Sequence, residues 1–335
     1  MTDGGRVLCI GDLVADVTVT SRGPIVAGSD TPGVVELSCG GSAANVAVWV
    51  ATCGGTARFV GVVGDDRLGE HLVGEIGDHG VHLDVLRRRG ARTRAIAALV
   101  TAPDREPDRP GADDGAGAGA SGEAAAAGEA GDRSMVSAID AATDLRVAEV
   151  SEDWFDGVDR LHLTAYTWFR ADGPALWDRL TSIARERSIP WSVDPSSAEM
   201  IRRTGRVEEL AAAMSGADVV FANRDEAAVL TGALDPAIAA GRLARGETTG
   251  VVTVGAAGVH VAPAGSAAFH LPAGPAEVVN TLGCGDAFAA GFLTARSRGA
   301  CVRASARLAI ETAARAAELA SAVPTPPGRG RPHAG

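Results

Sequence analysis

Short apolar runs alternate with helix-like segments over most of the chain, and this alternation constrains the fold more than any other feature. In the C-terminal half, strands are predicted at 158–164, 190–194, 217–222, 250–254 and 258–262, and helices near 172–187, 204–215 and 225–231 and from Asp286 onward. This alternation is typical of βαβ units around a parallel sheet, with helices on both faces. We therefore expect a three-layer α/β/α core with a mostly parallel central sheet.

The N-terminal part of the chain continues the pattern. A short apolar strand at 6–11 precedes Asp12, and a helix predicted at 42–53 is stopped by Gly54-Gly55. Further strands are predicted at 14–20, 33–37, 57–63, 93–101 and 133–138, with a helix from about 64 to 79. Binding sites in such sheets lie beyond the carboxyl ends of the strands. The residues expected to converge there, because each follows an apolar run, are Asp12, Asp194, Asn223 and Gly255.

Residues 103–132 consist mostly of Ala, Gly, Asp, Glu and Pro. A segment with no sizeable apolar side chain cannot bury enough surface to fold, so we expect a disordered hairpin insertion without a catalytic role. The stretch 324–335 is expected to be a disordered tail.

Charge and cysteine content exclude several classes of partner and site. A formal net charge of −11 and a pI near 5.1 argue against nucleic acid or an anionic membrane as a partner. No apolar run reaches the roughly 18 residues of a membrane span, and the first residues lack signal-peptide features, so a cytoplasmic location is expected. The five cysteines contain no C-x-x-C pair and are expected to be reduced thiols.

The chain contains no lysine, so all 31 of its Lys and Arg positions are arginines. A Walker A loop, a protein-kinase β3 lysine and a pyridoxal Schiff base each need a lysine, and all three are excluded. Any bound phosphate must therefore be contacted by backbone N–H groups, arginine or a metal ion.

Residues 280–293 (NTLGCGDAFAAGFL) combine a glycine-rich turn with Asp286 at the head of an apolar helix. The start of a helix presents unpaired N–H groups and a partial positive charge, which bind anions. A carboxylate fixed beside an anion site fits removal of a proton from a group that attacks the anion, as in phosphoryl transfer to a hydroxyl. The alternative is that Asp286 only caps the helix.

Five segments, in order between residues 6 and 322, together resemble the PfkB or ribokinase family of carbohydrate kinases. Residues 280–286 resemble its second signature, D-T-x-G-A-G-D, and residues 40–45 with 64–69 resemble the first. Residues 223–226 resemble its N-x-x-E element, residues 253–258 its T-x-G-x-x-G nucleotide loop, and Gly11 with Asp16 its sugar-binding strand end. The resemblance implies a ribokinase-like core with a small β-sheet lid, and ATP-dependent phosphorylation of a sugar.

The same resemblance implies that Asp286 is the general base that takes a proton from the sugar hydroxyl as it attacks the γ-phosphate of ATP. The backbone N–H groups of Gly283, Cys284 and Gly285 then stabilise the charge on the transferring phosphoryl group. A nucleophilic role for Cys284 is the alternative, but no His accompanies it in the motif, so a small packing residue is expected.

Binding residues are implied in the same way. The family pattern places Asp16, Gly40, Gly41 and Asn45 in the sugar pocket, with Asp16 accepting hydrogen bonds from paired hydroxyls. It places Asn223, Glu226, Thr253, Gly255 and Gly258 at the ATP phosphates, with Glu226 positioning Mg²⁺ through water. Each of these residues has an alternative interpretation. Asp16 can be a solvated charge at the end of its strand, and Asn45 an amide whose hydrogen bonds are made within the core. Asn223 and Glu226 can be a helix-capping pair, and residues 253–258 a hairpin turn.

The sequence departs from the family at two places. Asn280 stands where an Asp usually helps bind a monovalent cation, and this leaves potassium activation in doubt because the amide lacks the charge. The lid's Arg-Gly-Ala-Asn stretch has its nearest equivalent in residues 139–142 (IDAA), which carry no Arg. The loss of that Arg favours a neutral acceptor such as ribose, fructose or a nucleoside over an anionic one.

The expected core comprises residues 1–13, 39–92 and 141–323, and the expected lid comprises 14–38 and 93–140. The lid would close over the sugar and exclude water, and the edges of its sheet would favour a homodimer. The expected partners are ATP and a small sugar or nucleoside.

Three other functions are alternatives to a sugar kinase. The first is a nucleoside kinase on the same scaffold, and the second is a catalytically silent sugar- or nucleotide-binding regulator, against which the intact Asp286 argues. The third is a nicotinamide-dependent dehydrogenase. It is disfavoured because residues 11–16 read GDLVAD rather than G-x-G-x-x-G.

Overall fold

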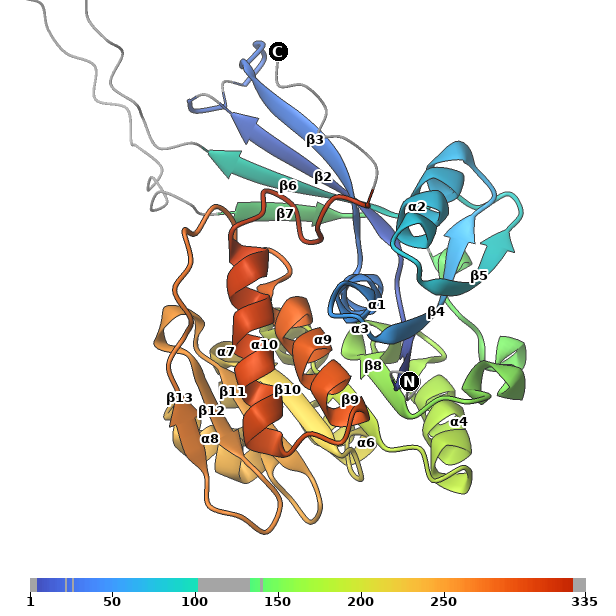
Figure 1. The fold of residues 1–335 in the computed structure, drawn as a ribbon. Helices are drawn as coiled ribbons and strands as arrows, with labels where there is room; N and C mark the ends of the chain where they lie inside the picture. The colour runs from blue at the N-terminus through green and yellow to red at the C-terminus, as the bar shows by residue number, and fades with distance from the viewer. Residues whose placement is uncertain (1–4, 22, 26, 102–132, 139–140, 328–335) are drawn as a thin grey trace, which may run out of the picture. The chain divides into compact units, whose positions relative to one another are not determined.

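The computed structural model describes residues 5–21, 23–25, 27–101, 133–138 and 141–327 (Figure 1). The chain divides into two compact units, one of residues 1–15, 39–94 and 140–335 and a smaller one of residues 16–38 and 95–139. The predicted insertion at 103–132 and the end of the predicted tail lie outside the described residues, as do two residues of the 139–142 segment.

The larger unit is built on a nine-stranded sheet in the order β13-β12-β11-β10-β9-β8-β1-β4-β5. Its strands are β1 (Arg6–Ile10), β4 (Thr56–Gly64), β5 (His82–Arg88), β8 (Arg160–Thr164), β9 (Trp191–Asp194), β10 (Val219–Asn223), β11 (Thr249–Thr253), β12 (Val259–Ala262) and β13 (Phe269–Leu271). Every neighbouring pair from β11 to β5 is parallel, whereas β12 and β13 pair antiparallel at the edge. The mostly parallel sheet predicted from the sequence is confirmed.

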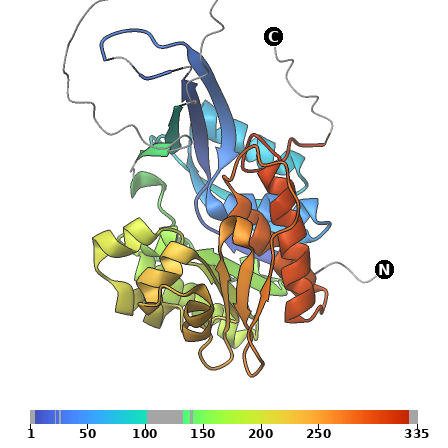
Figure 2. The ribbon, with the colours of Figure 1, turned by 90° about the vertical axis from the view of Figure 1, so that its left-hand side faces the viewer.

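Helices cover both faces of this sheet. They are α1 (Ser42–Thr52), α2 (Arg67–Asp78), α3 (Ala165–Trp168), α4 (Gly173–Glu186), α5 (Ala198–Thr204), α6 (Val207–Ala213), α7 (Arg224–Thr231), α8 (Pro236–Leu243), α9 (Cys284–Ser297) and α10 (Val302–Ala317). Helices α1, α9 and α10 lie on one face, and α4, α6, α7 and α8 lie on the other (Figures 1 and 2). None of the described helices is both long and apolar enough to span a membrane.

Small side chains allow α1 to sit deep in the core. Its residues from Ala43 to Val50 are all buried, and most of them are Ala or Val. Trp49 fills the remaining space and donates a hydrogen bond from Nε1 to the carbonyl oxygen of Ala322 at 2.9 Å. A buried tryptophan N–H needs such a partner. This packing fixes the start of α1 close to the carboxyl end of β1.

The smaller unit is a four-stranded sheet in the order β3-β2-β6-β7. Its strands are β2 (Val14–Ser21), β3 (Gly33–Gly40), β6 (Ala95–Thr101) and β7 (Arg133–Ser137), and the last two pair antiparallel with Ile96 opposite Ser137. Val34, Val35 and Leu37 on β3 are exposed. The roles predicted for this sheet, as a lid and a dimer interface, stay predictions.

Candidate active site

Asp286 is the third residue of α9, which begins two residues earlier than predicted. Gly283 adopts a left-handed conformation with φ 74° and is the N-cap residue, so the helix starts at Cys284. A Cβ on Gly283 would lie 2.7 Å from the carbonyl oxygen of Ala322, so only glycine fits this turn. The alternative in which Asp286 is merely the cap is therefore wrong.

The turn before Asp286 has the open side that an anion would need. A Cβ added to Gly285 would meet no atom within 4 Å. Its N–H lies in the first turn of α9, where a helix has no carbonyl four residues earlier to accept it. The N–H of Cys284 donates weakly to Thr281, at 3.4 Å. Space is thus open on one side of Gly285, and the anion site at this turn stays a prediction.

Two side chains from α1 hold the carboxylate of Asp286. Ser42 donates from Oγ to Oδ1 at 2.7 Å, and Asn45 donates from Nδ2 to Oδ2 at 2.8 Å. Asn45 is 5% exposed, and its predicted place in the sugar pocket stays a prediction. Ser42 was not among the predicted site residues. The available signal was its spacing, since residues three apart in a helix share a face.

Glycine is required where α1 approaches β1. Gly41 precedes α1 with φ 102°, and a Cβ there would overlap the carbonyl oxygen of Asp12. The first signature's glycines therefore bring Ser42 and Asn45 to the carboxyl end of β1, where Asp286 lies. A direct contact of Gly40 or Gly41 with substrate stays a prediction. Asp16 belongs to the smaller unit, and its predicted role with the sugar hydroxyls also stays a prediction.

Burial raises the pKa of Asp286 to about 6, while the hydrogen bonds from Ser42 and Asn45 oppose the rise. Burial also raises the pKa of Asp194, at the end of β9, well above its usual range, and Glu226 and Asp286 add to this. The pKa of Glu226 rises to about 7, mainly through burial. Three carboxyl groups from β9, α7 and α9 thus repel one another. Asp194, expected from the sequence only to lie at this edge, belongs to the cluster.

Asn223 and Glu226 form a capping box at the start of α7. The Asn223 side chain accepts from the N–H of Glu226 at 2.9 Å, and Glu226 Oε2 accepts from the N–H of Asn223 at 2.8 Å. Asn223 and Glu226 therefore cap α7, as the alternative interpretation of this motif expected. Glu226 is nonetheless 4% exposed and electrostatically linked to Asp286, which a cap alone does not require.

The loop after β11 combines a structural glycine with an open one. Gly258 has φ 96°, and a Cβ there would overlap the carbonyl oxygen of Leu271, so this residue makes the turn into β12. Gly255 has φ 58° and open space around an added Cβ. Thr253 ends β11, directly opposite Asn223 in the parallel register. The turn is thus present, and contact of this loop with a nucleotide stays a prediction.

Asn280 is occupied by local contacts. Its side chain donates from Nδ2 to the carbonyl oxygen of Ala320 at 2.8 Å and accepts from the N–H of Leu282 at 2.9 Å. These bonds shape the turn that leads to Gly283. The expectation about potassium activation that was based on Asn280 stays a prediction.

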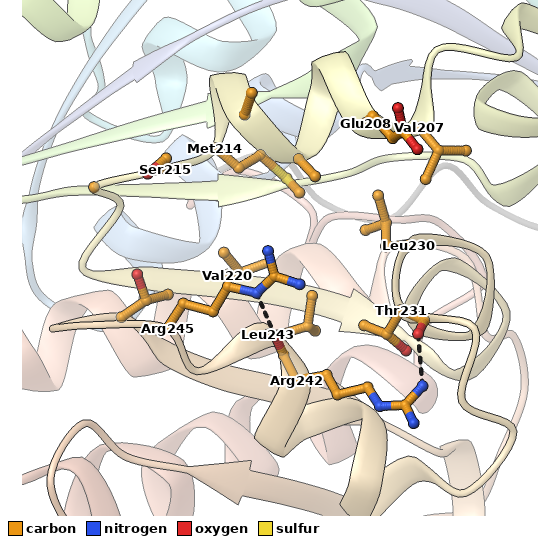
Figure 3. A pocket seen from close by; sticks show the side chains of 14 residues that line it. Val207, Glu208, Met214, Ser215, Val220, Leu230, Thr231, Arg242, Leu243 and Arg245 are labelled. Atoms are coloured by element: carbon orange, nitrogen blue, oxygen red, sulfur yellow. Dashed lines mark hydrogen bonds between the residues drawn. The ribbon is translucent and has the colours of Figure 1, made fainter.

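A cavity of about 390 Å³ lies elsewhere in the larger unit, near the amino ends of β10 and β11 (Figure 3). Met214, Val220 and Leu230 line it, together with two arginines. Arg242 donates to the carbonyl oxygen of Thr231 at 2.8 Å, at the end of α7. None of the predicted site residues lines this cavity, so it is separate from the cluster around Asp286.

Known proteins are similar to this chain in sequence and in fold. The family model described as pfkB family carbohydrate kinase matches residues 5–108 and 117–327. The chain is 30% identical over 325 residues to the bifunctional protein HldE of Caulobacter sp. (strain K31), covering 91% of this chain but 58% of that protein. It is 29% identical over 278 residues to aminoimidazole riboside kinase of Salmonella typhimurium, covering 79% of this chain and 76% of that protein.

A solved structure has the same fold. The adenosine kinase of Sinorhizobium meliloti superposes with a TM-score of 0.79 at 26% identity, covering 96% of each chain. The ribokinase-like fold expected from the motifs is thereby confirmed, and the matching family model spans most of the sequence. The chain therefore belongs to the pfkB family of carbohydrate kinases, which comprises sugar and nucleoside kinases.

Proposed function

We propose that this chain transfers the γ-phosphoryl group of ATP to a hydroxyl of a neutral sugar or nucleoside, with Asp286 as the general base. The observation that carries the proposal is the setting of Asp286. Its carboxylate is buried at the start of α9, held by two donors, directly after a glycine turn with open space at Gly285. A base is most useful when its pKa lies near the working pH, and a pKa of about 6 meets that condition.

In the proposed reaction, Asp286 accepts the proton of the acceptor hydroxyl while the hydroxyl oxygen forms a bond to the γ-phosphorus. The bond between that phosphorus and the bridging oxygen of ADP breaks, and ADP leaves with the electron pair. The N–H groups of the turn at Gly283, Cys284 and Gly285 face the negative charge on the transferring group. Because the chain has no lysine, these amides are proposed to bind the phosphate in place of a lysine side chain.

The residues around Asp286 fit a divalent cation held through water. Asp286 raises the pKa of both Asp194 and Glu226, and Glu226 also raises that of Asp194, so the site carries surplus negative charge that a cation offsets. Among the described residues, however, no group of three or more His, Cys, Asp or Glu side chains is arranged to hold a metal directly. Mg²⁺ would supply charge neutralisation at the ATP phosphates, with Glu226 orienting its waters.

The relatives support two acceptor classes. A riboside kinase and an adenosine kinase are both similar to this chain, which favours a nucleoside as a second candidate beside a free sugar. A silent regulator would not need to keep a buried carboxylate at a glycine turn, because that carboxylate costs stability when ionised. We therefore place the nucleoside alternative ahead of the silent one.

The test is a panel of acceptors with ATP and Mg²⁺, followed by ADP release and by mass spectrometry of the product. Ribose, fructose, adenosine and aminoimidazole riboside test the neutral acceptors, and 2-keto-3-deoxygluconate tests an anionic one. Phosphorylation of a neutral acceptor, with little of the anionic acid, is expected. Absence of phosphorylation across all acceptors would refute the kinase proposal and favour the silent regulator.

A further inference from the structure

Each oxygen of the Asp286 carboxylate has its own donor, and both donors come from the first turn of α1. Ser42 donates a hydrogen bond to Oδ1 at 2.7 Å, and Asn45 donates one to Oδ2 at 2.8 Å. These contacts join positions 244 and 241 residues apart, so they depend on the packing of α1 against α9. Two donors from one helix turn fix both the position and the rotation of the carboxylate plane.

Asn45 carries an unmatched acceptor that its packing does not explain. Its Oδ1 atom is buried and has no hydrogen-bond partner among the described residues. A buried polar atom without a partner is destabilising, and an apolar residue of the same shape would avoid the loss. The opposite amide orientation would place that oxygen against the carboxylate of Asp286, so the orientation with Nδ2 toward Asp286 is the favourable one. Asn45 therefore lowers the stability of the fold through its unpaired oxygen, while its Nδ2 group donates a hydrogen bond to Asp286.

Four ionisable groups near Asp286 have their pKa raised by its negative charge. They are the buried Cys9 on β1, Tyr166 on α3, Asp194 on β9 and Glu226 on α7, each linked electrostatically to Asp286. None of these four carries a positive charge. The hydrogen bonds from Ser42 and Asn45 oppose the effect of burial on the pKa of Asp286.

We propose that Ser42 and Asn45 are positioning residues that keep Asp286 ionised and turned to receive the proton of the acceptor hydroxyl. This inference rests on the proposed function of Asp286 as the base. It extends that proposal to the state of the base before substrate reacts. Ser42 had no role predicted from the sequence, and Asn45 was predicted only to line the sugar pocket.

The two donors differ in chemistry, and the difference assigns the proton to one oxygen. The Asn45 Nδ2 group can only donate, so Oδ2 must stay unprotonated to keep that bond. The Ser42 hydroxyl can donate to ionised Oδ1 or accept from protonated Oδ1, and the bond to the ionised oxygen is the stronger one, so Ser42 favours the ionised form. The proton removed from the acceptor therefore resides on Oδ1, and Ser42 follows both protonation states by rotating its hydroxyl.

The test measures kcat/KM against pH for Ser42→Ala and Ser42→Thr, with Ser182→Ala as the matched control. Ser182 lies on α4 and bonds Glu186 at the surface. Loss of one hydrogen bond to a charged group corresponds to a shift of about one pH unit. We expect the acid limb of Ser42→Ala to move up by about that amount with most activity kept at high pH, and Ser42→Thr to restore the wild-type profile. An acid limb for Ser42→Ala that coincides with the control would overturn the inference.

A second variant separates positioning from a structural role. Asn45→Leu removes both the donor and the unmatched acceptor and keeps the branched skeleton of the side chain, with two methyl groups in place of the amide oxygen and nitrogen. We expect the acid limb to move up and activity at neutral pH to fall, because ionised Asp286 loses a donor, while the melting temperature at pH 5, where Asp286 is mostly protonated, is kept. A large drop in melting temperature with an unshifted pH profile would show that Asn45 is structural.

The inference can also fail independently of the kinase proposal. Carboxyl-carbon NMR, with the Asp286 resonance assigned by Asp286→Asn, follows protonation without any turnover. An upward shift of the Asp286 titration in Ser42→Ala supports the inference even if no acceptor is phosphorylated. An unchanged titration rejects it even if the wild-type protein is an active kinase.

Discussion

Asp12 accepts a hydrogen bond from Arg94 at 2.9 Å, although the Arg94 side chain is only 4% exposed. The other oxygen of Asp12 accepts from Arg170, also at 2.9 Å, and Asp144 pairs with both arginines. The four charges balance within one cluster. The main-chain carbonyl of Asp12 also lies against Gly41, so the cluster supports the loop from which α1 starts.

Asp12→Ala is expected to destabilise the protein by about 3 kcal/mol, because it removes the Asp12 carboxylate from buried Arg94 and from Arg170. The measurement is urea unfolding followed by fluorescence. Asp156→Ala is the matched control, since its pair with Arg187 at 2.7 Å is on the surface and should contribute less than about 1 kcal/mol. Equal losses for the two variants would contradict the buried role of Asp12.

Gly41→Ala is expected to abolish activity and lower the melting temperature strongly. The new Cβ would overlap the Asp12 carbonyl, and φ 102° is unfavourable for any residue with a side chain. Gly74→Ala, within α2, is the control because its Cβ would meet open space. This control should be neutral or slightly stabilising, by up to about 1 kcal/mol. A Gly41→Ala protein as stable as the control would contradict the close approach.

Asp286→Asn is expected to lower kcat by about 10²–10⁴-fold while ATP binding is largely kept, because only proton removal is lost. The amide can place its oxygen toward Asn45 and its NH₂ toward Ser42, so the local packing is compatible with the change. Turnover by the acceptor assay and ATP affinity by calorimetry check the two parts. Glu209→Gln, on the exposed side of α6, serves as the control and should keep full turnover.

The same variant should be more stable than wild type at high pH. A carboxyl whose folded pKa of about 6 exceeds its usual 3.8 destabilises the fold once ionised. The penalty is absent below about pH 3.8, grows as the pH rises and is complete above about pH 6, where it reaches about 3 kcal/mol. Asp286→Asn removes it, so its gain in unfolding free energy should appear at pH 8 and vanish near pH 4. A gain of equal size at both pH values would contradict this account.

The wild-type pH profile of kcat/KM should show an acid limb near pH 6. The base must be ionised to accept a proton, so activity falls tenfold per pH unit below the pKa of Asp286, which is about 6. Rate measurements between pH 4.5 and 8.5 in buffers of constant ionic strength test this. A limb near pH 4, typical of an exposed carboxylate, would show that Asp286 is not the titrating base.

Glu226→Gln should leave α7 capped, because glutamine can accept from the N–H of Asn223 as glutamate does. We expect a weaker response to Mg²⁺, with activity at limiting Mg²⁺ reduced about 10-fold or more. Titrating Mg²⁺ at fixed ATP measures the effect. An unchanged Mg²⁺ dependence, with the fold intact, would leave Glu226 as a cap alone.

Much of the fold could be predicted from the sequence because it depends on local periodicity. The strands from β8 to β12 and the helices α1, α4 and α7 lie where apolar patterns and glycine stops placed them. β5, α8 and α10 were not predicted. β5 (HLDVLRR) lies at the edge of the sheet with little apolar alternation, and α10 is rich in alanine without a row of large side chains.

Some features of the candidate site could likewise be predicted from the local sequence, whereas others depend on the tertiary structure. The sequence by itself determined that a glycine turn precedes Asp286 and that the family signatures occur in order, because a glycine requirement and a helix start are local properties. Only the tertiary structure decided that Ser42 and Asn45 hold Asp286, and that Asp286 raises the pKa of Asp194 and Glu226. Those contacts join α1, β9, α7 and α9, and they exist because helices packed on a common sheet bring distant side chains together.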